Sequence, residues 1–254
     1  DYLLERMTDI LSHAGIDYVK WDMNRSICDI YSANCPAGEL YHRYVLGVYD
    51  LLEKLLARFP HLLLEGCSGG GGRFDAGMLY YSPQIWCSDN TDAINRLDIQ
   101  YGTSFFYPVS TMGAHVSAVP NHQTGRITPL ETRAHVAMSG SFGYELDLNT
   151  LPEEEKKLVP GQVETFHRYY DLTHEGDYYR LTSPETQSFM SWAFVSQDKK
   201  QALLTMVMTQ REGNPLGVHL TMAGLDDNTA YRCSYNGVVH RGNVWNRCGL
   251  TLAK

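Results

Sequence analysis

The chain has 254 residues, of which 43% are apolar and 20% are charged, and its formal net charge is −8 at pH 7. The length allows one large or two modest domains, and the composition is typical of a soluble globular protein. The acidic balance argues against nucleic acid or an anionic membrane as the main partner. No apolar run approaches the ~18 residues that a membrane helix needs, and the N-terminus has no signal-peptide pattern.

Six cysteines are scattered along the chain without a Cys-x-x-Cys pair. This spacing disfavours a zinc site and a dense disulfide framework, and it predicts reduced thiols in a cytoplasmic protein. A disulfide between Cys28 and Cys35 stays open as an alternative.

The first predicted element is a helix, because Leu4, Met7 and Leu11 follow helical spacing and Gly15 suits its C-terminal cap. No capping residue or leading loop precedes this helix. We therefore expect Asp1 to be a cut in a longer chain rather than a natural start.

Strands and helices then alternate as far as the middle of the chain. We expect mostly apolar strands at residues 16–22, 61–66, 83–89, 104–111 and 141–148. We expect helices at 45–59 (stopped by Pro60), at 91–102 (capped by Thr91 and ended by Gly102), at 133–140, and from about 151. This alternation is typical of a parallel α/β sheet. About five strand–helix units are too few to close an eight-stranded barrel.

The pattern changes after Leu181. Residues 188–209 alternate with period two around a polar turn, and the pair Asn236-Gly237 is a strong hairpin signal. We therefore predict an α/β domain over residues 1–181 and an antiparallel β-domain over 182–254.

The first candidate site residues end the first strand, in "YVKWDMNR". With a period of two, Tyr18, Lys20 and Asp22 lie on one face, while Val19 and Trp21 lie on the other. The carboxyl end of a strand is where α/β barrels place catalytic groups. Lys20 beside Asp22 would keep this carboxylate ionised, as a nucleophile requires. The alternative is a structural salt bridge.

A glycine-rich loop follows the second strand, in "LEGCSGGGGRFD". Its four glycines would let a ligand approach the backbone and would direct N–H donors toward it. A dinucleotide- or phosphate-binding loop would need Gly-x-Gly-x-x-Gly or Gly-Lys-Ser/Thr, and neither is present. Cys67, at the strand end, either lines the pocket or is a small buried residue.

The third segment, "WCSDNTDAINRL", begins at the third strand. Asp89 lies where strand changes to helix, so it is either a catalytic acid or a helix cap, and the helix dipole explains Asp92 in the first turn. A helix N-terminus favours the ionised carboxylate, so only burial under substrate and repulsion from Asp22 would keep Asp89 protonated. Trp86 is either a platform for a sugar ring or a core residue.

Two carboxylates on different strand ends, with a donor-rich loop between them, suit glycosidic bond cleavage better than metal binding. A metal would need closely spaced ligands. His115 and His122 are the only candidates, and we expect them to be hydrogen-bonding or structural groups, with Arg126 orienting their loop. No metal and no other cofactor is expected.

The segments "KWDMNR", "CSGGGGRFD", "WCSDNTDAINRLDIQYG" and "MGAHVSAVPNHQTGR" resemble, in order and spacing, the α-galactosidases of glycoside hydrolase family 36. The resemblance is to the bacterial and fungal hydrolases rather than to plant raffinose synthases. It implies that Asp22 is the catalytic nucleophile and Asp89 the acid/base. The residues expected at the sugar, from this resemblance and the patterns above, are Lys20, Trp21, Met23, Asn24, Cys67, Ser68, Gly69, Gly70 and Trp86.

The fold that the resemblance implies is an N-terminal β-sandwich, a central (β/α)8 barrel and a small C-terminal antiparallel β-domain. Several galactose contacts of family members, among them a pair of aspartates, a tryptophan and an arginine, come from earlier barrel strands that this sequence lacks. We therefore expect the second half of a TIM barrel, from the helix before strand four, followed by the C-terminal domain. This segment alone is expected to be inactive, and the full-length enzyme is expected to be a dimer or tetramer.

The expected reaction is retaining hydrolysis of terminal α-linked galactose, as in melibiose or raffinose, by double displacement. For this class the two carboxyl groups lie ~5–5.5 Å apart. Galactosyl transfer and α-N-acetylgalactosaminidase activity are alternatives within the same fold. A non-catalytic carbohydrate-binding barrel is disfavoured because both carboxylates and the lysine are present. A phosphate-binding barrel is disfavoured because we see no Lys or Arg partner for phosphate in the glycine loop.

Overall fold

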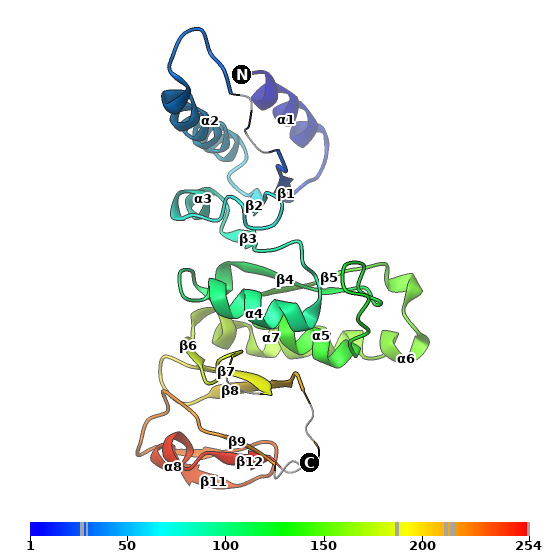
Figure 1. The fold of residues 1–254 in the computed structure, drawn as a ribbon, viewed down its shortest axis with the longest axis vertical. Helices are drawn as coiled ribbons and strands as arrows, with labels where there is room; N and C mark the ends of the chain where they lie inside the picture. The colour runs from blue at the N-terminus through cyan, green and yellow to red at the C-terminus, as the bar shows by residue number, and fades with distance from the viewer. Residues whose placement is uncertain (26–27, 29, 186–187, 211–212, 214–216, 253–254) are drawn as a thin grey trace. The chain divides into compact units, whose positions relative to one another are not determined.

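The computed structural model describes residues 1–25, 28, 30–185, 188–210, 213 and 217–252. The chain forms two compact units, which we treat separately (Figure 1). Unit 1 comprises residues 1–89 and 111–113, and unit 2 comprises residues 90–110 and 114–254. Among the described residues, no helix has the length and apolar character to cross a membrane.

A parallel sheet runs through the first half of the chain in the strand order β1-β2-β3-β4-β5. In unit 1, Lys20 is paired with Glu65, and Asp22 with Cys67, across β1 and β2. The strands of this sheet are β1 (Tyr18–Asp22), β2 (Leu63–Cys67), β3 (Gln84–Trp86), β4 (Met112–Ser117) and β5 (Ser141–Glu145). The predicted parallel α/β sheet, a partial barrel, is confirmed.

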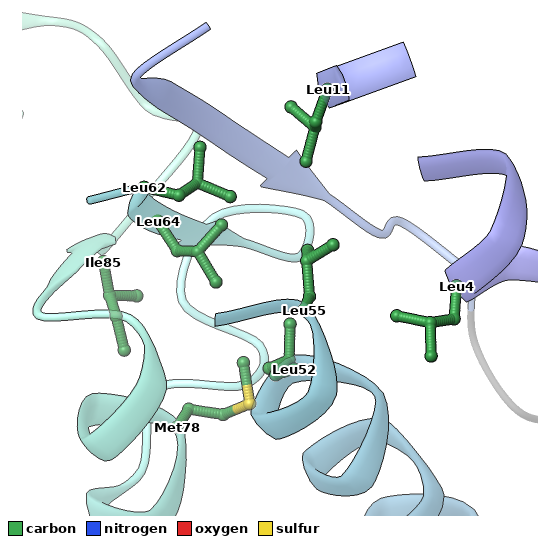
Figure 2. Packing of buried hydrophobic residues seen from close by; sticks show 8 residues of the cluster. All are labelled: Leu4, Leu11, Leu52, Leu55, Leu62, Leu64, Met78 and Ile85. Carbon is green, nitrogen blue, oxygen red and sulfur yellow. The ribbon is translucent and has the colours of Figure 1, made fainter. Parts of the chain in front are cut away.

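The helices of unit 1 cover the apolar face of the strands β1 to β3. They are α1 (Tyr2–His13), α2 (Ala37–Arg58) and α3 (Ala76–Tyr81). Figure 2 shows the buried side chains between these helices and the strands: Leu4, Leu11, Leu52, Leu55, Leu62, Leu64, Met78 and Ile85. Burial of apolar area on this scale is the main stabilising contribution to the unit, and it leaves the opposite sheet face available for polar groups.

Unit 2 continues the alternation and then becomes antiparallel. Its helical elements are α4 (Ala93–Thr103), α5 (Leu130–Ala137), η2 (Leu148–Thr150), α6 (Glu153–Lys156), α7 (Val159–Glu175) and α8 (Gly242–Arg247), and the short turn η1 (Val109–Thr111) precedes β4. A small cluster of Ala114, Val116, Leu130, Ala134 and Ala137 joins β4 to α5.

The remaining strands form three antiparallel sheets. One has the order β6-β7-β8, and the others pair β9 with β12 and β10 with β11. Their bounds are β6 (Asp177–Arg180), β7 (Phe189–Val195), β8 (Ala202–Met208), β9 (Val218–Leu220), β10 (Ala230–Arg232), β11 (Val239–Arg241) and β12 (Leu250–Leu252). The predicted hairpin at Asn236-Gly237 is confirmed between β10 and β11, with Gly237 at φ +73°. The domain boundary at Leu181 stays a prediction. The strand β6, which precedes this boundary, pairs with β7, which follows it.

The strand expected at residues 104–111 is wrong. After α4 ends, Phe106 and Tyr107 donate their N–H groups back to Thr103 O, each at 3.1 Å, so the chain continues in turns. Phe106 is 83% exposed. The strand was predicted here because aromatic residues are common in strands. The true strand, β4, contains small residues such as Gly113 and Ala114, which give a weak strand signal.

Several helix ends also differ from expectation. The helix predicted from Val45 begins earlier, at Ala37. The sequence did not reveal this start, because the first two turns are mostly polar and lack an apolar period. Asp92, not Thr91, caps α4, since its carboxylate accepts the N–H groups of Ile94 and Asn95. The single acidic helix expected from about residue 151 is two helices, α6 and α7.

The alternation of period two expected in residues 188–209 does not describe β7. This strand is buried along its whole length rather than on one face.

We expect Leu55→Ala to lower the free energy of unfolding by about 2–5 kcal/mol, because Leu55 is fully buried in the core of unit 1 and truncation leaves a cavity. Urea unfolding measures this loss. The matched control is Leu46→Ala on the same helix, where the side chain is 50% exposed. Its expected effect is within about 0.5 kcal/mol, and equal losses in the two variants would contradict the packing described.

Candidate active site

The inner face of the β1–β3 sheet is polar. Lys20 and Asp22 project from β1 beside Glu65 and Cys67 of β2, their paired residues. Trp21, on the other side of the strand, packs against the core of unit 1. The predicted alternation along β1 is therefore confirmed, and it brings a lysine and an aspartate to the same face.

Asp22 is an exposed carboxylate with two polar neighbours. Asn24 Nδ2 donates to Asp22 Oδ2 at 3.0 Å, and Cys67, the Cα partner of Asp22 on β2, lies beside it. Cys67 is only 6% exposed. Burial, together with the hydrogen bond to Asp22, raises the pKa of the thiol to about 11. Cys67 thus stays protonated near neutrality.

The glycine-rich loop is tied to the segment that follows Asp22. Gly69 N donates to Asn24 Oδ1 at 2.6 Å, and Ser68 Oγ donates to Met23 O at 2.5 Å. Arg73 Nη1 donates to the same carbonyl at 2.5 Å. Asn24 therefore connects Asp22 to the loop: its Nδ2 bonds to Asp22 and its Oδ1 to Gly69.

Arg73 corrects one step of the sequence reasoning. The loop does contain a cation, and its position directly after the glycines in "GGGGRFD" was the available signal. Its guanidinium donates to the backbone carbonyls of Met23 and Arg25. It holds the loop in place through these contacts.

The other side of the loop lies against the segment that carries Asp89. Gly70 has φ +77°, and a Cβ atom there would lie 2.7 Å from Ser88 Cα and 2.8 Å from Asp89 N. A Cβ on Gly71 would lie 2.8 Å from Cys87 O. Only glycine permits this backbone approach. The loop thus brings the segments of Asp22 and Asp89 to one end of the sheet.

Asp89 is exposed, and the capping role considered for it belongs to Asp92. In unit 2, Asp92 also accepts from Thr124 Oγ1 at 2.5 Å and from Arg126 Nη1 at 2.5 Å. Burial raises the pKa of Asp92, but the hydrogen bonds from Thr124 and the helix backbone, with the charge of Arg126, outweigh it and leave the pKa lowered. Arg126 therefore orients its loop, as expected.

The two histidines of that region have different surroundings. His115 Nδ1 lies 3.3 Å from Glu145 Oε2, between β4 and β5. His122 is exposed.

Lys20 forms an ion pair that the sequence did not single out. Its Nζ lies 3.5 Å from Oε1 of Glu65, a carboxylate that is 1% exposed, and 4.7 Å from the ring centroid of Trp86. Glu65 stands in an apolar run, "HLLLEGC", where an acid is unusual. That mismatch was the signal that could have found it.

Three residues expected at the sugar have side chains that face other protein groups. Trp86 is 3% exposed and lies beneath Lys20, which agrees with the core role considered for it. Trp21 and Met23 line a cavity of about 20 Å³ on the side of α2. This volume holds about one water molecule, so the cavity is too small for a sugar.

Sequence profiles of known families match almost the whole chain. One described as Melibiase matches residues 1–176, and one described as Glycosyl hydrolase family 36 C-terminal domain matches residues 189–254. The chain belongs to glycoside hydrolase family 36. This membership confirms the resemblance seen in the sequence motifs.

Family 36 relatives are similar over nearly the full chain. The bifunctional α-galactosidase/sucrose kinase AgaSK of Mediterraneibacter gnavus is 53% identical over 252 residues, which are 99% of this chain and 26% of the relative. The α-galactosidase AgaA of Geobacillus stearothermophilus is 51% identical over 241 residues, 94% of this chain and 33% of the relative. The chain thus spans about a quarter to a third of the length of these proteins.

Solved structures show the same fold. The galactosidase domain of AgaSK superposes with a TM-score of 0.95 at 52% identity, covering 99% of this chain and 34% of that one. AgaA superposes with a TM-score of 0.96 at 49% identity, covering 100% of this chain and 36% of that one. Variants of AgaA were crystallised in complex with raffinose and with stachyose.

We expect Gly70→Ala to lower the melting temperature clearly more than Gly69→Ala. Both residues have positive φ, so both alanines are strained by about 1–2 kcal/mol. Only at Gly70 would the Cβ also collide with the backbone of Ser88 and Asp89. Thermal unfolding of the two variants measures the difference, and similar melting temperatures would contradict the close approach.

We expect Cys67 to resist alkylation at pH 8, because its thiol is buried and its pKa is raised to about 11. The exposed Cys248 serves as the internal control. Mass spectrometry of peptides after iodoacetamide treatment compares the two sites. The rate at Cys67 should rise as the pH approaches 11, and equal labelling of both cysteines at pH 8 would refute the arrangement.

Proposed function

We propose that this chain supplies both catalytic carboxylates of a retaining α-galactosidase that removes terminal α-linked galactose from oligosaccharides of the melibiose and raffinose type. Relatives about 50% identical to it are α-galactosidases, and a variant of one of them was crystallised with raffinose. The chain spans about a third of that relative, so the proposal concerns the full-length enzyme.

In the first step, an oxygen of Asp22 attacks the anomeric carbon and Asp89 gives its proton to the leaving oxygen, which releases the aglycone. In the second step, Asp89 takes a proton from water, and the oxygen of this water displaces Asp22 from the anomeric carbon. Galactose leaves with its original configuration, and both carboxyl groups return to their starting states.

The surroundings of Asp22 suit a nucleophile. The Asn24 amide donates to its carboxylate, which helps to fix its direction, and the uncharged Cys67 thiol lies on the paired position of β2. An exposed carboxylate at the carboxyl end of a parallel strand is reachable by substrate.

The sugar hydroxyls would be bound by Lys20, Asn24 and the loop from Cys67 to Gly70. Backbone N–H groups of a glycine loop can approach a ligand closely. Trp21, Met23 and Trp86 would then support these groups from behind, since their side chains face the protein.

One observation carries the proposal: Gly69 is bonded to the Asn24 that holds Asp22, and Gly70 lies against the backbone of Asp89. The same four-residue loop therefore contacts the segments of both carboxylates. Double displacement needs two carboxyl groups at one end of the sheet, separated by about one sugar ring.

We also propose a cytoplasmic location and a dimer or tetramer. All six cysteines are free thiols, which suits a reducing compartment. The oligomeric state rests on the family resemblance and can be measured by light scattering of the purified full-length enzyme.

We expect Asp22→Ala in the full-length enzyme to lower kcat for nitrophenyl α-galactoside by about four orders of magnitude or more, since no covalent intermediate can form. Azide should restore turnover and give a product of inverted configuration. Asp89→Ala should cost about 10²–10⁴-fold with poor leaving groups and much less with good ones.

The matched controls are Asp17→Ala and Asp98→Ala, which remove exposed carboxylates near β1 and on α4. Both should retain normal activity. Near-normal turnover by Asp22→Ala would overturn the assignment. A preference for N-acetylgalactosaminides in a panel of nitrophenyl glycosides would overturn the proposed substrate.

A further inference from the structure

Glu65 is a buried carboxylate in the middle of β2, and polar side chains from both neighbouring strands surround it. It is 1% exposed and is the direct Cα partner of Lys20 on β1. A buried carboxylate costs several kcal/mol unless it is paired and hydrogen-bonded. A residue with this cost in a short strand requires a physical explanation.

The two oxygens of Glu65 have different partners. Oε2 accepts a hydrogen bond from the Tyr18 hydroxyl and another from Gln84 Nε2 at 3.2 Å. Oε1 lies 3.5 Å from Lys20 Nζ. Tyr18 and Gln84, from the two neighbouring strands, therefore fix the carboxylate so that its other oxygen faces the lysine.

Trp86 supplies a second support for Lys20. Its ring centroid lies 4.7 Å from Lys20 Nζ, a distance typical of a cation–π contact. A Cβ on Gly113 would lie 3.0 Å from Trp86 Cε3 and 3.3 Å from Glu65 Oε1. Glycine at this position on β4 lets the ring and the carboxylate pack together beneath the lysine.

The two partners of this ion pair differ in exposure: the Lys20 side chain is 30% exposed, while that of Glu65 is 2% exposed. Lys20 also stands two residues before Asp22 on the same face of β1. The carboxylate of this pair is therefore buried, whereas the ammonium that it contacts remains partly exposed.

We propose that Glu65 is a positioning residue for Lys20: together with Trp86 it holds the ammonium in the orientation in which Lys20 binds the hydroxyl groups of the sugar. This inference rests on the proposed function, in which Lys20 binds galactose. Tyr18 and Gln84 act one step further away, through the Glu65 carboxylate.

The test is a double-mutant cycle in the full-length enzyme, with galactose affinity measured by calorimetry. Glu65→Gln should weaken galactose binding about tenfold, because a charge-assisted hydrogen bond is no longer aligned. In the Lys20→Met background the same substitution should change the affinity less than about twofold. The kcat/KM values for nitrophenyl α-galactoside should follow the same pattern.

Two further variants separate positioning from folding. Tyr18→Phe keeps the Glu65 carboxyl group and removes only one hydrogen bond to its Oε2, so a smaller loss of affinity, about threefold, is expected, again only when Lys20 is present. Ile85→Val removes one methylene from the core beneath the same sheet. It should lower the melting temperature without changing galactose affinity.

The outcomes are distinct. Equal losses of affinity from Glu65→Gln and Tyr18→Phe with and without Lys20 would overturn the positioning role and leave a structural one. Unchanged affinity in both variants would also overturn it. If the unmodified enzyme failed to bind galactose, the proposed function itself would be wrong.

Discussion

The close approach of the backbone at Gly70 to the backbone of Ser88 and Asp89 is the constraint on which the site depends. No side chain fits there, because a Cβ would lie 2.7 Å from Ser88 Cα. On its other side the loop is bonded to Asn24 through Gly69 N. The loop therefore contacts the segments of both Asp22 and Asp89, whose strands β1 and β3 are each paired with β2.

The inner face of the sheet shows how a polar site is kept on a stable framework. Its outer face is packed with leucines against the helices, and this burial offsets the cost of placing Lys20, Asp22 and Glu65 on the other side. Each inner group has a partner on an adjacent strand: Glu65 pairs with Lys20, and Cys67 with Asp22. The parallel register brings these partners directly opposite one another.

Unit 2 also contains a buried acid whose partners come from separate segments of the chain. Asp92 caps α4 with its carboxylate and also binds Thr124 and Arg126, so one buried acid fixes both a helix start and a long loop. Its lowered pKa follows from the number of donors around it. Asp92 is thus a structural acid, whereas Asp89, three residues earlier, is exposed.

The sequence by itself determined the class of fold, the face of β1 that carries Lys20 and Asp22, the hairpin at Asn236-Gly237 and the family. These features depend on local periodicity, turn chemistry and motif order, which are written along the chain. It misplaced β4, because exposed aromatics at 104–107 imitate a strand, and it overlooked Glu65 and Arg73.

Only the tertiary structure decided the partners of each charge. Lys20 pairs with Glu65, 45 positions away, and the two meet because strands β1 and β2 are in register. Trp86 proved to be a support beneath Lys20 for the same reason. Pairings of this kind depend on which strands become neighbours and in which register. The linear pattern of residues does not specify either, so it cannot give the distance between two side chains on different strands.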